Sequence, residues 1–258
     1  MSIALHHLNV FVTGASSGIG EACARAFARE GANVLMCARR LDRIETLARH
    51  LEDKYAVTTH AFKLDVRDRA AVDRSIGGLP PFWEKIDILV NNAGLSRGLV
   101  TVQAGDVQDW EEMIDTNVKG LLYVTRMVLP GMIRHGSGHV INMGSIAGHQ
   151  LYPNGNVYCA SKYAVTALSE GLRMDLLGTN IRVSSVDPGL VETEFSEVRF
   201  HGDRARAAQT YAHMRPLKGE DVAEAVIFCA TRPPHVDIAQ LIIMPTDQAS
   251  VNHVHRSA

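Results

Sequence analysis

Strand patterns and helix patterns alternate along almost the whole chain, and this alternation constrains its fold more than any other feature. Short apolar runs predict strands near residues 8–13, 33–37, 57–63, 86–90, 138–144, 181–187 and 240–244. Amphipathic patterns between them predict helices near residues 18–30, 41–53, 68–78, 106–135, 155–177 and 219–230. Strands that are connected through helices form right-handed βαβ units and run parallel. We therefore expect an α/β fold with a doubly wound, seven-stranded parallel sheet and helices on both faces.

Length and composition favour a single domain. The 258 residues can form one large core, and no linker rich in proline or serine divides them, so we expect one domain over residues 1–258. The net charge of −2 provides no basic field for nucleic acid. No apolar run approaches the roughly 18 residues that a membrane span needs, and the segment from Met1 to Ala4 has no signal-peptide pattern. We expect a cytoplasmic chain with neither nucleic-acid nor membrane partners.

The cysteines and histidines show no arrangement typical of disulfides or metal sites. The four cysteines lie far apart without CxxC or zinc spacing, so we expect reduced thiols in the core. Cys159 follows Tyr158, but on a helix it points about 100° away from it, so we assign it no catalytic role. The 12 histidines form no group with metal-ligand spacing, so we expect no metal.

A glycine-rich segment, Gly14-Ala15-Ser16-Ser17-Gly18-Ile19-Gly20, joins the first expected strand to the first expected helix. This order is typical of a phosphate-binding turn, in which the helix N-terminus faces the anion. Gly14 would allow the tight turn, Gly18 a close approach to a pyrophosphate, and Gly20 close packing of the helix against the strand. The alternative is an ordinary loop. Because both flanks fit, we predict a dinucleotide site formed by Gly14, Ser16, Ser17, Gly18, Ile19 and Gly20.

The second expected strand ends at Arg39 and Arg40, about 20 residues after the glycines. An Asp or Glu at this point would bind the ribose 2′-hydroxyl of NAD, but none is present. Two arginines instead suit a 2′-phosphate, through charge-assisted hydrogen bonds and stacking on adenine. Alternatively they only solvate the start of the next helix, although a helix N-terminus disfavours cations. We predict NADP as the cofactor.

Tyr158 and Lys162 are four residues apart on an expected helix, so they lie on one helix face. An ammonium group beside a phenol lowers the phenol pKa, which suits proton transfer to or from an alcohol oxygen. Ser145, after the apolar run 140–144, could hold that oxygen. The alternative is an exposed helix pair worth about 0.3 kcal/mol. Together with a hydride carrier, the arrangement predicts an alcohol dehydrogenase or carbonyl reductase.

Residues 189–218 interrupt the alternation of strands and helices. They follow a strand end, are rich in arginine and aromatic residues, and show little periodicity before residues 205–211. Ligands of such sheets bind at the carboxyl ends of the strands, where this segment begins. We expect a substrate lid that excludes water, because ordinary surface loops of this length are uncommon.

Several motifs follow one another in a fixed order: Thr13-Gly-Ala-Ser-Ser-Gly-Ile-Gly20, Leu64-Asp65-Val66, Asn91-Asn92-Ala93-Gly94, Asn117-Val118-Lys119-Gly120, Gly144-Ser145, Tyr158-Cys-Ala-Ser-Lys162 and Asp187-Pro188-Gly189. With this ordered set, the chain resembles the short-chain dehydrogenase/reductase family over nearly its whole length. The resemblance implies a single-domain Rossmann fold.

The resemblance also implies roles for individual residues. Tyr158 would be the general acid/base, and Lys162 would lower its pKa and bind the nicotinamide ribose. Ser145 would hydrogen-bond the substrate carbonyl, and Asn117, in a kinked helix, would position a water that links Lys162 to solvent. The other cofactor contacts implied by the family are Asp65 at the adenine, Asn91 or Asn92 at the adenosine ribose, and Pro188, Gly189, Val191 and Thr193 at the nicotinamide end.

Longer stretches, among them residues 86–95, 109–117, 155–158, 188–200 and 252–256, are similar to the NADP-dependent 3-hydroxy acid dehydrogenases of this family. That group includes serine/allo-threonine dehydrogenases and malonic semialdehyde reductases, and sulfoacetaldehyde reductases are close to it. The resemblance implies a small anionic substrate and therefore a cation in the pocket. Arg199 is the first candidate and Arg97 the second, although Arg199 could instead pair with Glu194 or Glu197. The segment His149-Gln150-Leu151-Tyr152 departs from the group's pattern, which leaves the identity of the acid open.

Three other functions remain possible from the sequence alone. A reductase of the same fold could act on ketoacyl carriers or hydrophobic ketones. A dinucleotide-sensing protein without activity is disfavoured by the intact Asn117, Ser145, Tyr158 and Lys162. An epimerase or dehydratase with tightly held NAD is disfavoured by the arginine pair.

The family resemblance further implies a homotetramer. The expected helices 106–135 and 155–177 carry apolar residues on more than one face, although all of them could face the sheet instead. The apolar residues concerned are Leu121, Leu122, Val124, Met127, Val128, Val165, Leu168, Leu172 and Leu176.

Overall fold

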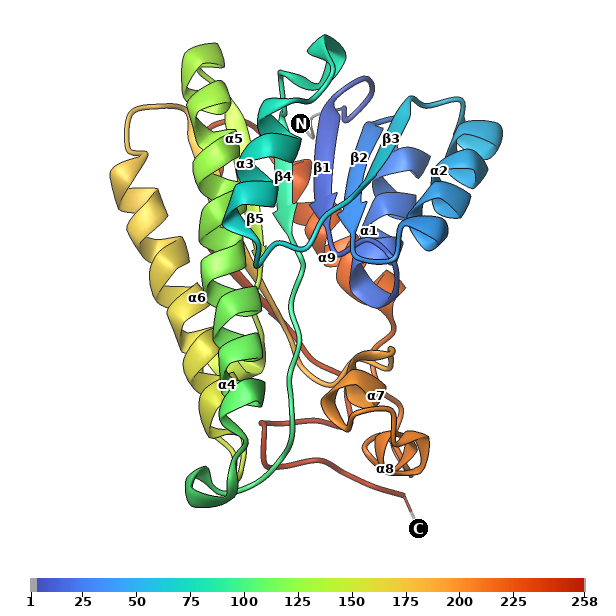
Figure 1. Cartoon of the computed structure of the whole chain (residues 1–258), viewed down its shortest axis with the longest axis vertical. Helices are drawn as coiled ribbons and strands as arrows, with labels where there is room; N and C mark the ends of the chain where they lie inside the picture. Colours follow the sequence, from blue (N-terminus) through green and yellow to red (C-terminus); the bar gives the residue numbers. More distant parts are fainter. Residues whose placement is uncertain (1–3, 258) are drawn as a thin grey trace.

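Seven parallel strands form one sheet in the order β3-β2-β1-β4-β5-β6-β7 in the computed structural model, which describes residues 4–257 (Figure 1). The strands are β1 Asn9–Thr13, β2 Asn33–Ala38, β3 Thr59–Lys63, β4 Ile88–Asn91, β5 Gly138–Met143, β6 Ile181–Pro188 and β7 Gln240–Ile243. The chain builds outward from β1 to β3 and then returns to place β4 on the other side of β1. This reversal creates a crevice at the carboxyl ends of β1 and β4, where ligands of doubly wound sheets bind.

Helices cover both faces of the sheet (Figure 1). They are α1 Gly18–Arg29, α2 Leu41–Tyr55, α3 Arg69–Gly77, α4 Val107–Ile114, α5 Leu121–His135, α6 Asn156–Asp175, α7 Phe195–Arg199, α8 Arg204–Gln209 and α9 Gly219–Ala230. A π-helical turn, Asp115–Gly120, joins α4 to α5, and short 3-10 helices span Pro81–Trp83, Val102–Ala104 and Ile146–Gly148. The prediction of a seven-stranded α/β sheet is confirmed, and the boundaries agree within a few residues.

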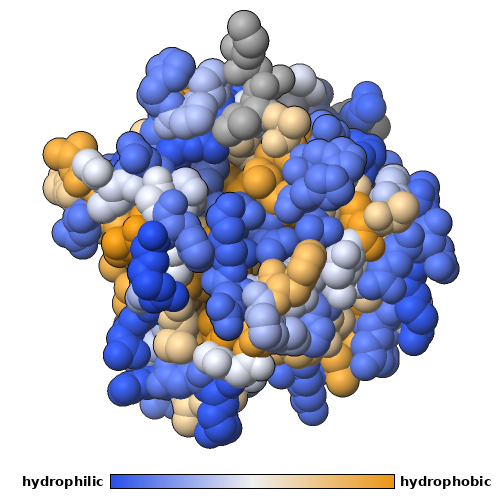
Figure 2. All heavy atoms as spheres, turned by 90° about the horizontal axis from the view of Figure 1, so that it is seen from above, coloured by the Kyte–Doolittle hydropathy of each residue, from blue (hydrophilic) through white to orange (hydrophobic). Residues whose placement is uncertain are grey.

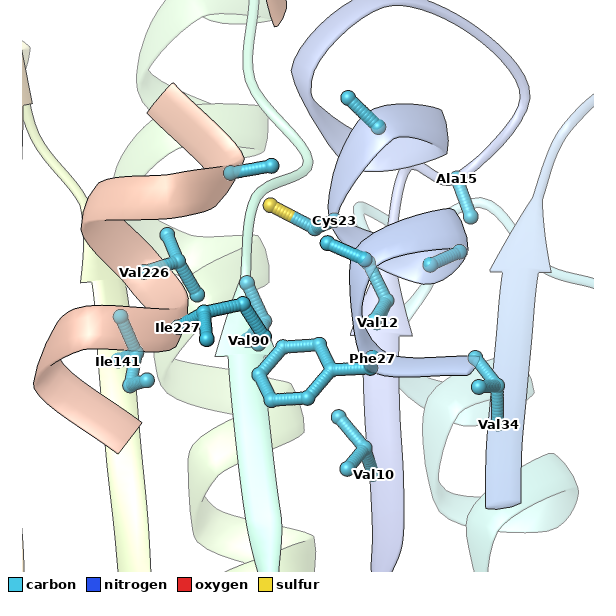
Figure 3. Close-up of a cluster of buried hydrophobic side chains, with 14 of the residues drawn as sticks. Val10, Val12, Ala15, Cys23, Phe27, Val34, Val90, Ile141, Val226 and Ile227 are labelled. Atoms are coloured by element: carbon cyan, nitrogen blue, oxygen red, sulfur yellow. The ribbon is translucent and has the colours of Figure 1, made fainter. Parts of the chain in front are cut away.

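Successive residues of the strands pack into two separate cores. In β1, Val10 and Val12 face α1, α2 and α9, whereas Phe11 faces α3 and α5. Side chains on a strand alternate between its faces, so a strand that is covered on both sides is apolar throughout. Figure 3 shows the first core, in which the ring of Phe27 from α1 lies near Val10 and Val90.

The expected long helix over residues 106–135 is divided into two helices. The π turn adds a wider loop of backbone between α4 and α5, and Thr116 and Asn117 are buried in it. Such π turns are rare and often lie at functional sites. The sequence placed Asn117 in a kinked helix, and the structure locates the irregularity at this residue.

The surfaces of α5 and α6 expose a different set of apolar residues from the set that the sequence suggested. Among the apolar residues singled out there, Leu122 alone is exposed, Leu168 is half-buried, and the others are buried or packed against the core. Other large apolar residues of this region are exposed instead: Ile133, Tyr163, Met174 and Leu177.

Residues 189–218 lie at the carboxyl ends of the strands and contain α7 and α8 (Figure 1). Near them the C-terminal residues fold back, and Arg256 donates to the backbone oxygens of Thr210 and Ala212. Figure 2 shows the opposite end of the molecule, which is mostly hydrophilic with small apolar patches. Of the helices within residues 4–257, none combines the length and the apolar character needed to cross a membrane.

Candidate active site

A cavity of about 720 Å³ runs from the glycine-rich segment to Tyr158 along the carboxyl edge of the sheet. Its volume suits a small-molecule or cofactor site, which typically measures roughly 300–1,000 Å³. Most of the residues that we predicted for the site reach its wall: Gly14, Ser16, Ser17, Gly18, Ile19, Arg39, Arg40, Asp65, Asn92, Ser145, Tyr158, Lys162, Pro188, Gly189, Val191, Thr193 and Arg199. Gly20, Asn91 and Asn117 lie behind the wall.

The glycine-rich segment has a backbone that only glycine adopts easily. Gly14 and Gly18 have φ of +68° and +57°, in the left-handed region. A Cβ on Gly20 would overlap the Gly14 carbonyl oxygen and the Asn92 side chain. The N-terminus of α1 has no side-chain cap at Ser17, so its first N–H groups are available to an anion in the cavity. This cradle fits the pyrophosphate of a dinucleotide.

Arg40 lies directly beside this segment. Its guanidinium donates to the hydroxyl oxygen of Ser16 at 3.1 Å and of Ser17 at 2.8 Å. Another nitrogen of the Arg40 guanidinium, Nη1, donates to a carboxylate oxygen of Glu194 at 2.7 Å. Arg43, in the first turn of α2, donates to the other oxygen of Glu194 at 2.6 Å. Arg40 therefore does not merely solvate the start of a helix.

Arg39 occupies the next part of the cavity wall. Its Nη1 lies 3.5 Å from a Glu112 oxygen, and half of its side chain is exposed. Asp65, nearby in the wall, accepts from the Arg67 guanidinium at 2.6 Å. Hydrogen bonds and the charge of Arg67 hold the pKa of Asp65 below its usual value, although burial opposes this. Asp65 is thus a fixed anion at the end of the cavity where we predicted the adenine.

The two neighbouring asparagines at the end of β4 have different surroundings. Asn92 donates to the backbone oxygens of Thr13 at 2.9 Å and Gly14 at 3.2 Å, so it fixes the glycine turn from the cavity wall. The Asn91 side chain points into the sheet core and donates to Thr125 and Asn142. The prediction of a cofactor contact is therefore wrong for the side chain of Asn91, because strand alternation turns it away from the cavity.

Tyr158 and Lys162 are both buried on the face of α6 that borders the cavity. Lys162 Nζ donates to the backbone oxygen of Met143 at 2.8 Å and lies 6.0 Å from the centroid of the Tyr158 ring. Phe195 of α7 packs edge-on against that ring, with centroids 5.7 Å apart. The phenol is therefore held between α6 and α7.

The charges around Tyr158 differ from the sequence prediction. Burial raises the pKa of Tyr158, and the Arg199 guanidinium and a hydrogen bond with Ser145 oppose that rise. The expected decrease of this pKa is thus not met in this structure, because desolvation outweighs the nearby charge. Burial also lowers the pKa of Lys162 to about 8, while the Asp187 carboxylate raises it.

Ser145 and Asn117 are held by backbone contacts around Tyr158. The Ser145 hydroxyl accepts from the backbone N–H of Ala147 at 3.1 Å and reaches the cavity. Asn117 accepts from the N–H of Leu95 and donates to its carbonyl oxygen, both at 2.8 Å, and donates to Ser161 at 3.0 Å. The side chain of Asn117 therefore ties the segment after β4 to α6 from behind the cavity.

Arg199 extends from α7 over the end of the cavity that contains Tyr158. Its guanidinium carbon lies 5.2 Å from the Tyr158 ring centroid, and Nη2 donates to the Tyr152 hydroxyl at 3.0 Å. Its Nε is buried and has no hydrogen-bond partner within residues 4–257. Glu194 pairs with Arg40 and Arg43, and Glu197 pairs with Arg204, so the alternative pairing for Arg199 is wrong.

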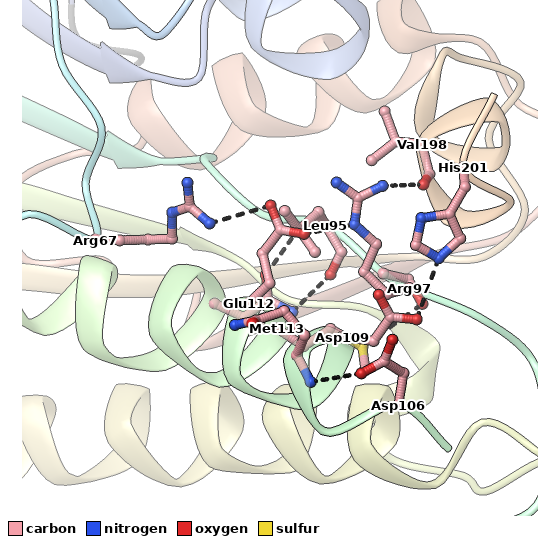
Figure 4. Close-up of polar contacts among 12 residues, drawn as sticks. Arg67, Leu95, Arg97, Asp106, Asp109, Glu112, Met113, Val198 and His201 are labelled. Carbon is pink, nitrogen blue, oxygen red and sulfur yellow. Dashed lines mark hydrogen bonds and ion pairs between the residues drawn. The ribbon is translucent and has the colours of Figure 1, made fainter. Parts of the chain in front are cut away.

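Arg97, the second candidate cation, faces away from this cavity. Its Nε lies 2.6 Å from a Glu112 oxygen, and its Nη1 donates to the Val198 carbonyl oxygen (Figure 4). The neighbouring Gly98 N–H donates to the Arg199 carbonyl oxygen at 2.9 Å. The prediction that Arg97 could bind the substrate is wrong; its segment instead holds the end of α7, which carries Arg199.

Several wall residues have no counterpart among the predicted contacts. Phe195 and Glu194 belong to the segment that we expected to be a lid, and Tyr152 belongs to the segment whose departure from the family pattern was noted. The C-terminal tail also contributes to the wall, through Gln248, Val251, Val254 and Arg256. Only the similarity of residues 252–256 to the family suggested a role for this tail.

Known proteins resemble this chain in sequence and in structure. The sequence model of the family described as short chain dehydrogenase matches residues 8–203. NADP-dependent 3-hydroxy acid dehydrogenase YdfG of Shigella flexneri is 48% identical over 249 residues, which cover 96% of this chain and 99% of that protein. Sulfoacetaldehyde reductase 2 of Chromohalobacter salexigens is 46% identical over 241 residues, 93% of this chain and 95% of that protein. The closed form of serine dehydrogenase complexed with NADP+ is similar in structure, with a TM-score of 0.90 and 47% identity over 97% of this chain and 100% of that one.

Proposed function

The chain belongs to the short chain dehydrogenase family, and on that premise we propose that it interconverts small anionic hydroxy acids and their semialdehydes with NADP. One observation carries the substrate class. Arg199 places a half-buried guanidinium, whose Nε is buried and has no hydrogen-bond partner within residues 4–257, over the ring of the candidate proton donor. An N–H donor that is buried without an acceptor costs free energy unless a ligand supplies the acceptor, and an anionic ligand would also neutralise the guanidinium charge.

NADP would lie along the cavity from the glycine turn to Tyr158. Gly14, Gly18 and the N-terminus of α1 would hold the pyrophosphate, and Asp65 would lie at the adenine. Arg39 and Arg40, with Arg43 behind them, would neutralise the 2′-phosphate. Residues Pro188, Gly189, Val191 and Thr193 would bind the nicotinamide end. When bound, the cofactor supplies a hydride acceptor for the alcohol or a hydride donor for the carbonyl.

Tyr158 would move the proton. In the direction of reduction its phenol donates a hydrogen bond and then the proton to the substrate oxygen, and Ser145 Oγ donates a second hydrogen bond. Preorganised donors of this kind are worth roughly 3 kcal/mol each in the transition state. In the direction of oxidation Tyr158 accepts the hydroxyl proton, and Arg199, Lys162 and Ser145 favour its anionic form. Asn117 would position a water through which Lys162 exchanges protons with solvent.

Arg199 would bind the carboxylate of the substrate. A guanidinium presents paired donors that match a carboxylate, and burial strengthens the interaction. Tyr152 accepts from Nη2 and so fixes the orientation of the group. The distance between Arg199 and the phenol would then select acids whose hydroxyl lies a short distance from the carboxylate.

We assign residues 189–218 a role as a substrate lid within one dinucleotide-binding catalytic domain over residues 1–258. The segment carries Phe195 and Arg199 against Tyr158, and α7 is held by Arg97 and Gly98. Its closure would exclude water from the reacting oxygen.

Sulfoacetaldehyde is the second candidate substrate. The similarity to sulfoacetaldehyde reductase 2 supports it, and a sulfonate would bind the same guanidinium as a carboxylate.

We also propose a homotetramer and a cytoplasmic location. The exposed Leu122, Met174 and Leu177 near α5 and α6 support an interface, and four unpaired cysteines within the described chain suit a reducing compartment.

The substrate class is tested by Arg199→Gln with two substrates of equal carbon skeleton. NADP+ reduction is followed with 3-hydroxypropionate and with the neutral 1,3-propanediol, and serine, isethionate and NAD+ extend the panel. We expect kcat/KM for the acid to fall about 10- to 100-fold, because hydrogen bonds to charged groups contribute roughly 1.5–3 kcal/mol. The value for the diol should fall less, because the diol loses only the effect of the Arg199 charge on Tyr158.

Arg204→Gln is the matched control, because Arg204 is an exposed arginine on α8 that pairs with Glu197. It should leave both values unchanged. An equal loss for acid and diol in Arg199→Gln would refute the carboxylate role and leave Arg199 only its effect on Tyr158 or on the fold.

A further inference from the structure

Glu194 joins the lid segment to two arginines on the opposite side of the cavity. One carboxylate oxygen lies 2.7 Å from Arg40 Nη1 and the other lies 2.6 Å from Arg43 Nη1. The three side chains come from the β2–α2 junction and from the turn before α7, and all are about 40% exposed. No other carboxylate within the described residues is paired with Arg40 or Arg43.

Arg40 has almost no free donor left in this arrangement. Its guanidinium carries five N–H groups. Its Nε and Nη2 donate to the Ser16 and Ser17 hydroxyls, and its Nη1 donates to Glu194. A phosphate that binds Arg40 through two parallel hydrogen bonds must therefore displace one of these acceptors. Glu194 is the acceptor that carries a charge, so it competes with the phosphate electrostatically as well as for hydrogen bonds.

Glu194 cannot simply move outward with the whole segment. Thr193 contacts Gly18 so closely that a Cβ on this glycine would lie 3.1 Å from the Thr193 side chain. On the other side Phe195 begins α7 and packs on Tyr158. The backbone at Glu194 is therefore fixed at the edge of the phosphate cradle, and release of Arg40 requires rotation of the Glu194 side chain or a shift of α7.

We infer that Glu194 lowers the selectivity for NADP over NAD: it is an internal carboxylate that competes with the 2′-phosphate of NADP for Arg40 and Arg43. The inference rests on the proposed assignment of the 2′-phosphate to the Arg39 and Arg40 region. A nucleotide without a 2′-phosphate leaves the Glu194 bridges intact, whereas a nucleotide with one must break them. Glu194 thus weakens binding of 2′-phosphorylated nucleotides selectively and reduces the preference for NADP over NAD.

The test is equilibrium binding of two nucleotide probes by isothermal titration calorimetry on the full chain. The probes are 2′,5′-ADP and 5′-ADP, which carry two phosphates each and differ in where the second one is attached. In Glu194→Gln, which keeps the shape but removes the charge, we expect 2′,5′-ADP to bind about threefold to tenfold more tightly. Binding of 5′-ADP should stay within about twofold of the wild-type value.

Two control variants separate the possible failures. Glu197→Gln removes a carboxylate three residues further along, on α7, where it pairs with Arg204, and should leave both affinities unchanged. Arg40→Ala should abolish most of the preference for 2′,5′-ADP over 5′-ADP. If that preference survives in Arg40→Ala, the proposed 2′-phosphate site itself is wrong.

If Arg40→Ala behaves as expected but Glu194→Gln binds 2′,5′-ADP no more tightly than wild type, the competition is refuted. Weaker binding refutes it as well, because Glu194 would then support the nucleotide rather than compete with it. An equal gain for both probes would also overturn the inference, since a general reduction of negative charge would explain it.

Discussion

Lys162 and Asp187 are two buried side chains on whose charges the pH dependence of the proposed reaction should depend. The Lys162 side chain is buried in the cavity wall, where burial lowers its pKa to about 8 and the Asp187 carboxylate opposes the decrease. Asp187 is fully buried and accepts from Ser185 Oγ at 2.6 Å, and its other oxygen lies 2.9 Å from His149 Nε2. The charge of Lys162 is therefore retained only below mildly alkaline pH.

We expect kcat for carbonyl reduction at saturating NADPH to fall as the pH rises through about 8, because Lys162 then loses its proton and its charge. In Asp187→Asn the carboxylate no longer raises the Lys162 pKa, so the midpoint of this fall should move to lower pH. Steady-state rates between pH 6 and about 10 provide the measurement. Tyr158→Phe, which lacks the proton donor, should be about 10³-fold slower throughout. An unchanged midpoint in Asp187→Asn would show that another group causes the fall.

At the residue scale the sequence predicted side chains whose role depends on local spacing. Tyr158 and Lys162 lie on one face of α6 because they are four residues apart, and the glycines are identified by the turn they permit. The sequence did not separate Arg199 from Arg97, because their difference is tertiary: Glu112 pairs with Arg97, and nothing within residues 4–257 forms an ion pair with Arg199. It also missed Glu194 and Arg43, which meet across 151 residues of chain.

At the element scale, the first turn of α1 is the most tightly packed part of the cofactor cradle. A methyl group on Gly20 would overlap the Gly14 carbonyl oxygen and the Asn92 side chain, neither of which can move without opening the turn. We expect Gly20→Ala to destabilise the fold by about 2 kcal/mol or more and to weaken 2′,5′-ADP binding. Thermal unfolding and calorimetry measure the two effects.

Gly77→Ala is the matched control for this change. Gly77 ends α3, is exposed, and an added methyl would meet only the Met127 side chain at 3.8 Å. There alanine should be neutral or stabilising by about 0.5–1 kcal/mol, because it restricts the unfolded chain. Equal melting temperatures for Gly20→Ala and Gly77→Ala would contradict the packing argument.

The elements themselves were largely predictable because this sheet is covered on both faces. Its central strands, such as β2 and β4, are nearly continuous apolar runs and its helices have one apolar stripe, so the two patterns differ. The π turn at Asp115–Gly120 and the separate helices α7 and α8 were not predictable in detail. Both depend on contacts with distant segments, such as Asn117 with Leu95 and Arg97 with Val198.

At the scale of the whole molecule, the residues that we assign to the site are concentrated at one edge of the sheet. The glycine turn, the Tyr158 face of α6, α7 and the C-terminal tail meet there although they are far apart in the sequence. The tail is the least predictable part, since it has no periodic pattern. It is held by hydrogen bonds to Leu151 and to the turn after α8.

The outer surface of α5 and α6, and the turn that follows α6, leave apolar side chains exposed in the single chain. Met174 and Leu177 are 75% and 87% exposed, and Leu122 is 38% exposed. Exposed apolar residues that lie in one region often mark an interface between subunits.

We expect the wild-type chain to have the mass of a tetramer in light scattering coupled to size-exclusion chromatography. The double variant Leu122→Glu, Met174→Glu should be smaller, because its new carboxylates would be buried without partners. Phe82→Glu, at an exposed apolar site on another part of the surface, should keep the wild-type mass. A monomeric wild type, or a double variant of unchanged mass, would rule out this interface.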